Sequence, residues 1–67
     1  MAKFTKKQID GYFNANKDGG TCFNDNYNVT TYGITSAEYH AMHSVLVDCF
    51  GLCMPNAAEK RKALKNA

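Results

Sequence analysis

The sequence lacks any long run of apolar residues. The opening Met-Ala-Lys-Phe-Thr-Lys-Lys is not followed by the apolar segment that a secretory signal peptide requires. No stretch approaches the roughly 18 apolar residues of a transmembrane helix. We therefore expect a cytoplasmic protein with no membrane contact.

Strong net charge is also lacking. Eight Lys and Arg residues against six Asp and Glu residues leave a formal net charge of +2 at pH 7, which is too weak to indicate nucleic-acid binding by itself. The cations are confined to the two ends of the chain, and the segment from Asp18 to Cys53 contains no Lys or Arg. That middle segment carries four acids: Asp18, Asp25, Glu38 and Asp48.

The chain has little length with which to build a core. Its 67 residues are predicted to form a single domain, residues 1–67. A core of this size rarely supplies more than about 3–5 kcal/mol unless a disulfide, a metal or a partner chain adds to it. The three cysteines, Cys22, Cys49 and Cys53, are an odd number, which in a reducing compartment favours free, buried thiols.

No catalytic or cofactor motif is complete. Residues 14–19 match the first half of an EF-hand calcium loop, but Asp25 stands where the loop needs a bidentate Glu. For zinc, neither His40 nor His43 shares the helix face of Cys49, and a site built from all three cysteines and a His would need the chain to reverse after residue 51. No Cys–His pair belongs to a catalytic motif. We therefore expect no metal, no cofactor and no enzymatic activity.

Capping signals mark the starts of three helices. Thr5 with Gln8, and Thr35 with Glu38, fit the capping box, in which the Thr hydroxyl accepts from the third helical N–H and that residue's side chain reaches back. Asn56 can cap a third helix. The predicted helices run over about Lys6–Lys17, Ser36–Phe50 and Ala57–Asn66.

Helical spacing of the apolar residues predicts which faces are buried. The core face of the first helix is predicted to be Ile9, Tyr12, Phe13 and Asn16, with Gly11 on the opposite side. The core face of the second is predicted to be Tyr39, Met42, Leu46, Cys49 and Phe50. This second arc is wider than the stripe of an ordinary surface helix. It should therefore pack against more than one neighbour or meet a partner, for which a second copy of the chain is one candidate.

The segment between the first two helices favours strands. Tyr, Val and Thr alternate with polar residues from Tyr27 to Tyr32, after a turn-forming Asn-Asp-Asn cluster. We predict a short β-hairpin that pairs residues 21–23 with residues 27–32. The predicted fold class is small α+β, in the order helix, hairpin, helix, helix. The alternative is an all-α fold with a long ordered loop.

The same segment provides the leading hypothesis for function. Its Tyr, Asn and Thr residues cannot all be buried in so small a protein, and such surfaces combine rigid aromatic area with adaptable hydrogen bonding. We predict a non-enzymatic protein-binding module, an inhibitor or adaptor of a larger protein or complex, of the kind common among viral and mobile-element accessory factors. The predicted contact residues are Tyr27, Tyr32, Asn26 and Asn28, with Tyr27 the more exposed tyrosine. The simpler interpretation is a polar hairpin whose Tyr rings cover the core.

The basic ends of the chain suggest a second hypothesis, a nucleic-acid-binding accessory protein that uses both ends to contact phosphates. In the C-terminal segment the candidate residues are Lys60, Arg61, Lys62 and Lys65. Cations at a helix C-terminus are more often simply solvated there. No helix-turn-helix or zinc-finger signature accompanies them.

Overall fold

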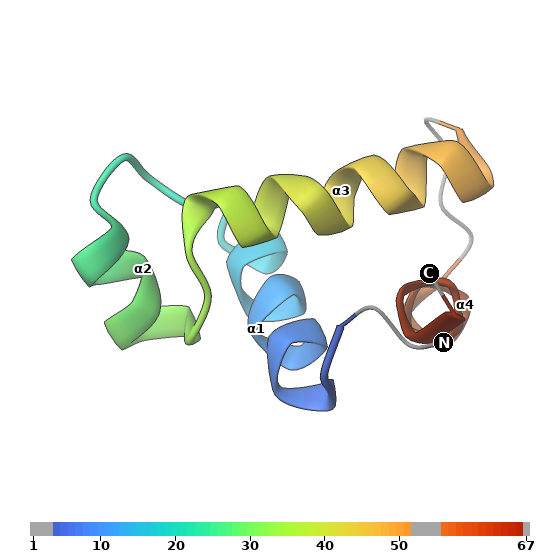
Figure 1. The fold of residues 1–67 in the computed structure, drawn as a ribbon, viewed down its shortest axis with the longest axis horizontal. Coiled ribbons are helices and arrows are strands. Elements are labelled where there is room, and N and C mark those ends of the chain that lie inside the picture. Colours follow the sequence, from blue (N-terminus) through green and yellow to red (C-terminus); the bar gives the residue numbers. More distant parts are fainter. Residues whose placement is uncertain (1–3, 52–55, 67) are drawn as a thin grey trace.

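The computed structural model describes residues 4–51 and 56–66. Within these ranges the chain forms four α-helices: α1 (Lys6–Lys17), α2 (Asp25–Tyr32), α3 (Ser36–Phe50) and α4 (Ala57–Asn66) (Figure 1). No strand occurs in these two ranges, so the predicted α+β fold with a hairpin is wrong. The alternative had the right fold class, but the expected long loop contains α2.

The two predicted capping boxes are both formed. The Thr5 hydroxyl accepts from the N–H of Gln8 at 3.2 Å, and Gln8 Oε1 accepts from the N–H of Thr5 at 2.9 Å. Thr35 and Glu38 make the same pair of bonds, at 3.2 Å and 2.9 Å. These bonds satisfy N–H groups that the first turn of a helix leaves without partners. The predicted bounds of α1 and α3 are accordingly confirmed.

A further hydrogen bond joins the two capping boxes. The Gln8 amide nitrogen donates to Glu38 Oε2 at 2.6 Å, which fixes the start of α1 beside the start of α3. The pKa of Glu38 is lowered, mainly because its carboxylate accepts from the N–H of Thr35 and also because it accepts from Gln8. Two local motifs are thus combined into one tertiary contact.

Helix α2 replaces the predicted hairpin because both of its ends carry helix signals. Asn24 is its N-cap, and the side-chain oxygen accepts from the N–H of Tyr27 at 3.2 Å. Gly33 ends the helix in the left-handed conformation (φ 81°) and donates its N–H to the carbonyls of Asn28 (3.2 Å) and Val29 (2.9 Å). Glycine is the residue that adopts this conformation without steric cost. These caps outweigh the strand preference of the residues between them.

Helix α1 packs against each of the other three helices. The Tyr12 ring of α1 stacks on the Tyr39 ring of α3, with centroids 4.9 Å apart and an interplanar angle of 25°. The Tyr39 hydroxyl donates to Asn16 Oδ1 at 3.1 Å. The buried apolar residues around this stack are Ile9, Tyr12, Ala15, Ile34, Tyr39, Met42, Leu46 and Leu64.

Gly11 lies on a buried side of α1, and its predicted position on the outer side of the helix is wrong. A Cβ atom at Gly11 would overlap the backbone carbonyl oxygen of Tyr32 and would lie 3.1 Å from Cγ2 of Ile34. The expectation failed because it assumed one core face. The unpredicted helix α2 covers the other side of α1, and only glycine permits so close an approach of its backbone.

The two cysteines that the structure describes are both exposed free thiols, Cys22 and Cys49. The prediction of buried thiols is therefore wrong for these two, and Cys53 lies outside the described residues. On α3 the predicted core face holds for Tyr39, Met42 and Leu46, while Phe50 is half-buried. Cys49 falls outside the packed face because α4 covers only part of this end of α3.

Helix α4 has the predicted bounds and packs against both α3 and α1. Asn56 Oδ1 accepts from the N–H of Glu59 at 2.9 Å, as predicted. Leu64 is completely buried. Arg61 places its guanidinium carbon 5.4 Å from the ring centroid of Phe13 and a nitrogen 3.9 Å from Asp10 Oδ1. Helix α4 therefore uses one of its cations to dock on α1.

None of the described helices is both long enough and apolar enough to cross a membrane.

Candidate protein-binding surface

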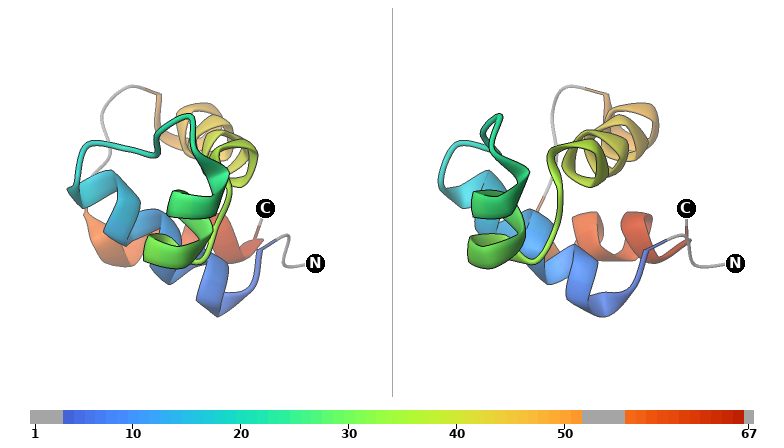
Figure 2. Two further views of the ribbon diagram at one scale, coloured as in Figure 1. Left: turned by 90° about the vertical axis from the view of Figure 1, so that its left-hand side faces the viewer. Right: turned by 60° about the vertical axis from the view of Figure 1, so that its left-hand side comes forward.

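Helix α2 and the loop before it form one end of the molecule. Figure 1 places α2 at one end of the longest axis, which measures 29 Å, with α4 toward the other end. In Figure 2, where the α2 end comes forward, α2 and the preceding loop form an outer face in front of α1. The surface of this end, which we call the α2 end, is built from residues 18–33 and contains no Lys or Arg.

Asn28 holds the α2 end together from inside. Its side chain is completely buried (0% exposed). Asn28 Oδ1 accepts from the N–H of Cys22 at 3.1 Å, and Nδ2 donates to the Cys22 carbonyl at 2.9 Å. Nδ2 also donates to Asp25 Oδ1 at 3.2 Å. Asn28, predicted as a contact residue, therefore supports the surface from within and offers no exposed area itself.

Asp25 connects α2 to α3. Its Oδ1 accepts from the N–H of Ser36 at 2.9 Å as well as from Asn28. These two hydrogen bonds, that from Ser36 first, lower the pKa of Asp25. The charge also lies in the first turn of α2, where a carboxylate is favoured by the helix dipole. The short helix is thus fixed to its neighbours before any partner binds.

The two tyrosines predicted as contact residues lie side by side on α2. Tyr27 is 53% exposed and Tyr32 is half-buried, which is the predicted order. The two residues were predicted to lie on a strand, but they lie five positions apart on helix α2. Their rings meet edge to face, with centroids 6.4 Å apart at 85°. The Tyr32 hydroxyl donates to Asp18 Oδ2 at 3.0 Å. Asn26, also predicted, is exposed.

Phe23 is the most exposed large apolar residue of the α2 end, with a relative exposure of 108%. It precedes the N-cap Asn24, the position from which an apolar residue normally packs onto the fourth helical residue. In α3 those two positions are Ile34 and Tyr39, and both belong to the core. In α2 the fourth helical residue is the polar, buried Asn28, so Phe23 has no apolar partner there.

Sequence reasoning missed Phe23 because it placed the residue in a strand. Had Asn24 been identified as an N-cap, the polar Asn28 at the fourth helical position would have shown that Phe23 lacks the usual apolar partner. Val29 is also exposed, at 49%. At about 100° per residue it lies on the other side of α2 from Tyr27. Phe23 and Tyr27 are therefore the two most exposed aromatic side chains of this end.

The basic residues of α4 do not converge on one face. Arg61 points to α1, where it contacts Phe13 and Asp10. Lys62 lies on the side toward α3, Lys60 is half-buried and Lys65 is exposed. The residues predicted for phosphate binding are thus divided between different sides of the helix, and one of them is already engaged.

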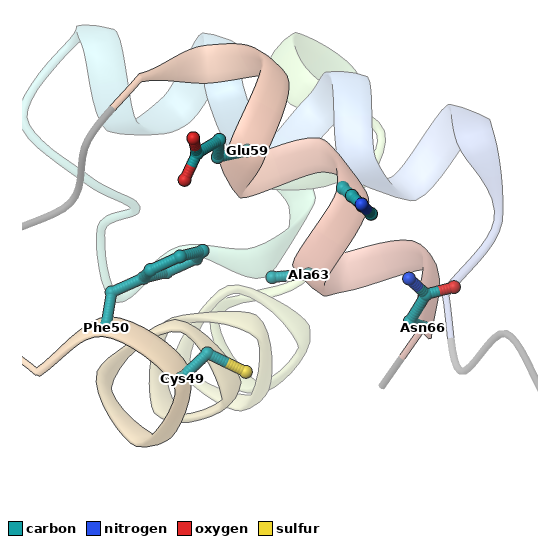
Figure 3. A pocket seen from close by; sticks show the side chains of 6 residues that line it. Cys49, Phe50, Glu59, Ala63 and Asn66 are labelled. Carbon is teal, nitrogen blue, oxygen red and sulfur yellow. The ribbon is translucent and has the colours of Figure 1, made fainter.

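A shallow groove of about 520 Å³ lies between one side of α4 and the end of α3. Figure 3 shows Cys49 and Phe50 of α3 facing Glu59, Ala63 and Asn66 of α4. Lys62 completes the lining. Among the described residues that line the groove, no His and no second thiol lies beside Cys49.

Within residues 4–51 and 56–66, no three His, Cys, Asp or Glu side chains are placed to hold a metal ion. Comparison with protein-family models, curated proteins and solved structures finds no match to this chain. The arrangement of the α2 end is therefore the basis for the functional argument.

Proposed function

We propose that the chain is a small non-enzymatic protein-binding module, an inhibitor or adaptor of a larger protein, that engages its partner through Phe23 and Tyr27. The observation that carries this proposal is the complete exposure of the Phe23 ring. Leaving a large aromatic ring in water forgoes roughly 1.5–3 kcal/mol of burial. A partner that covers the ring recovers this free energy.

The construction of the α2 end supports the proposal. Interfaces concentrate their binding energy in a few residues, with aromatic residues prominent among them. Asn28 and Asp25 fix the backbone on which Phe23 and Tyr27 stand. A partner therefore meets a surface that needs little ordering, which reduces the entropic cost of association.

The proposal also includes the cellular compartment and the type of protein. The exposed free thiols Cys22 and Cys49 fit a reducing compartment, in keeping with a cytoplasmic protein. Small size and an interaction surface without catalytic groups fit an accessory factor of the viral or mobile-element type.

Affinity capture from a lysate of the cells in which the protein is naturally made tests the proposal. The immobilised chain should retain a defined protein, and Phe23→Ala should weaken its binding by about 2 kcal/mol, roughly 30-fold. Val29→Ala is the matched control, because Val29 is an apolar, exposed residue on the other side of α2. This control variant should bind like the wild-type chain.

A second arm addresses the basic residues. Replacing Lys62 and Lys65 together with Ala should leave capture unchanged, since neither residue belongs to the α2 end. The proposal is wrong if this double variant loses all binding while Phe23→Ala loses none. Nucleic-acid binding with a steep dependence on salt concentration would then replace it.

A further inference from the structure

The edge-to-face pair of Tyr27 and Tyr32 creates a corner between two aromatic faces. The rings stand at 85° with centroids 6.4 Å apart. When two rings meet at a right angle, a face of each borders the same space. A cation in that space lies within about 6 Å of both centroids, the range in which the negative face of an aromatic ring attracts positive charge.

A carboxylate stands beside the corner. The Tyr32 hydroxyl donates to Asp18 Oδ2 at 3.0 Å, while Asp18 Oδ1 makes no hydrogen bond to the described residues. The Asp18 backbone is fixed at the end of α1, because its N–H donates to the carbonyl of Ala15 at 3.1 Å. One oxygen therefore orients the tyrosine and the other is left to accept from a ligand.

The described residues form no close ion pair with this carboxylate. Among the described residues, no Lys or Arg nitrogen lies within 4 Å of Asp18. Lys7 reaches the far end of α2, where its Cε is 3.9 Å from the place of a Cβ on Gly33. The pKa of Tyr32 is raised, mainly because its hydroxyl donates to Asp18, so this donor keeps its proton near neutral pH.

We infer that Tyr27, Tyr32 and Asp18 form a recognition site for an arginine side chain presented by the partner protein. A planar guanidinium stacks on an aromatic ring and donates N–H groups to a carboxylate in its own plane, whereas a lysine ammonium does not stack in this way. The charge of the α2 end is complementary to such a ligand, because residues 18–33 carry Asp18 and Asp25 and no cation. The inference rests on the proposed function, for which it names the chemistry of the partner.

An NMR titration of the full chain labelled with ¹⁵N tests the site directly. The probe is the peptide acetyl-Gly-Arg-Gly-amide, and the control peptide carries citrulline, which has nearly the same shape and no charge. The arginine peptide should shift the amide signals around Asp18, Tyr27 and Tyr32 in a saturable way, with a millimolar Kd. The citrulline peptide should bind at least about tenfold more weakly, because it lacks the charge-assisted hydrogen bond.

Variants separate the site from a general effect of charge. Asp18→Asn keeps an acceptor for the Tyr32 hydroxyl but removes the charge, and should weaken the arginine peptide by about fivefold or more. Tyr27→Leu removes one aromatic wall and should weaken it by about two- to fivefold. Asp48→Asn is the matched control: it alters net charge equally, at an exposed position on α3, and should have no effect. The same spectra show whether each variant is folded.

The outcomes distinguish this inference from the proposed function. Absence of saturable shifts, or equal weakening by Asp18→Asn and Asp48→Asn, overturns the arginine site. If capture of a partner still depends on Phe23 in that case, the binding module stands without it. Saturable binding that Asp18→Asn and Tyr27→Leu weaken supports the site, even if capture proves independent of Phe23 and the proposed function fails.

Discussion

Gly11→Ala should destabilise the protein, although glycine in the middle of a helix is normally unfavourable. Helix propensity alone predicts that this change stabilises α1 by about 1 kcal/mol. The added methyl group, however, would overlap the carbonyl oxygen of Tyr32, and backbone cannot move aside as a flexible side chain can. Helix α2 would have to shift away from α1.

The magnitude follows from these two opposing effects. Overpacking that forces a backbone shift costs about 1–3 kcal/mol, and an overlap with backbone belongs near the upper end of that range. After subtraction of the propensity gain, we expect a net loss of about 1–2 kcal/mol. For a domain that has only about 3–5 kcal/mol in total, this is a large fraction. Tm should fall by on the order of 10 °C.

Urea unfolding followed by circular dichroism measures this effect, with Asn14→Ala as the control. Asn14 is an exposed residue of the same helix, so its replacement should show the propensity gain alone, a few tenths of a kcal/mol. If Gly11→Ala raises the midpoint of unfolding as Asn14→Ala does, the close contact between α1 and α2 is wrong.

Four further predictions concern polar groups of the described structure. Asn28→Ala should lower the free energy of unfolding in urea by about 2–3 kcal/mol, because both backbone groups of Cys22 lose their side-chain partner. The control Asn26→Ala, at an exposed position, should cost less than about 0.5 kcal/mol. A cost as small as this for Asn28→Ala would contradict the role of Asn28. The Tyr12 hydroxyl is buried without a hydrogen-bond partner in the described chain, so Tyr12→Phe should leave stability unchanged or raise it, whereas Tyr39→Phe loses the bond to Asn16 and should cost about 0.5–1.5 kcal/mol. Burial raises the pKa of Tyr12 from 10.0 to about 12. The contribution of this group to stability is therefore complete below pH 10 and is lost as the pH rises toward 12, by at most about 1.4 kcal/mol per pH unit. Tyr12→Phe should reduce this alkaline loss, and an alkaline profile identical to that of the wild-type chain would refute the assignment. The pKa of Glu38 is lowered from 4.5, so its contribution is present above pH 4.5 and is lost as the pH falls through the lowered pKa; Glu38→Gln should make the acid limb of a stability–pH profile shallower.

The capped helices could be predicted from the sequence, whereas α2 was not. Thr5 and Thr35 each have their return partner three residues later, and these bonds form within one turn whatever the rest of the chain does. Helix α2 has only 8 residues, too few to be stable alone. Its Tyr, Val and Thr residues favour a strand, but the caps at Asn24 and Gly33 and the buried hydrogen bonds of Asn28 together outweigh that preference. Those bonds depend on where residue 22 lies, which sequence periodicity does not show.

The candidate surface could be predicted in part. The exposure of Tyr27 was predicted from its place beside the Asn turn, but its contact with Tyr32 depends on a helix that was predicted to be a strand. The bond from Tyr32 of α2 to Asp18, the residue that caps the end of α1, spans 14 residues and cannot be read from local sequence. Asn28 was predicted as a contact residue but is buried, because composition cannot distinguish a buried amide from an exposed one.

Each capping box joins residues only three apart, and this short separation affects how fast the chain folds. A helix start that is completed by its own neighbours costs little loop-closure entropy, and helical proteins dominated by such near contacts fold in microseconds to milliseconds. The bond between Gln8 and Glu38 then links two starts that are 30 residues apart. We expect this pairing of α1 with α3 to be the slow step of folding, with α2 closing onto Gly11 afterwards. If the pairing of α1 with α3 is the slow step, replacing Gln8 should slow folding. Gly11→Ala acts on a contact that forms later and should mainly speed unfolding.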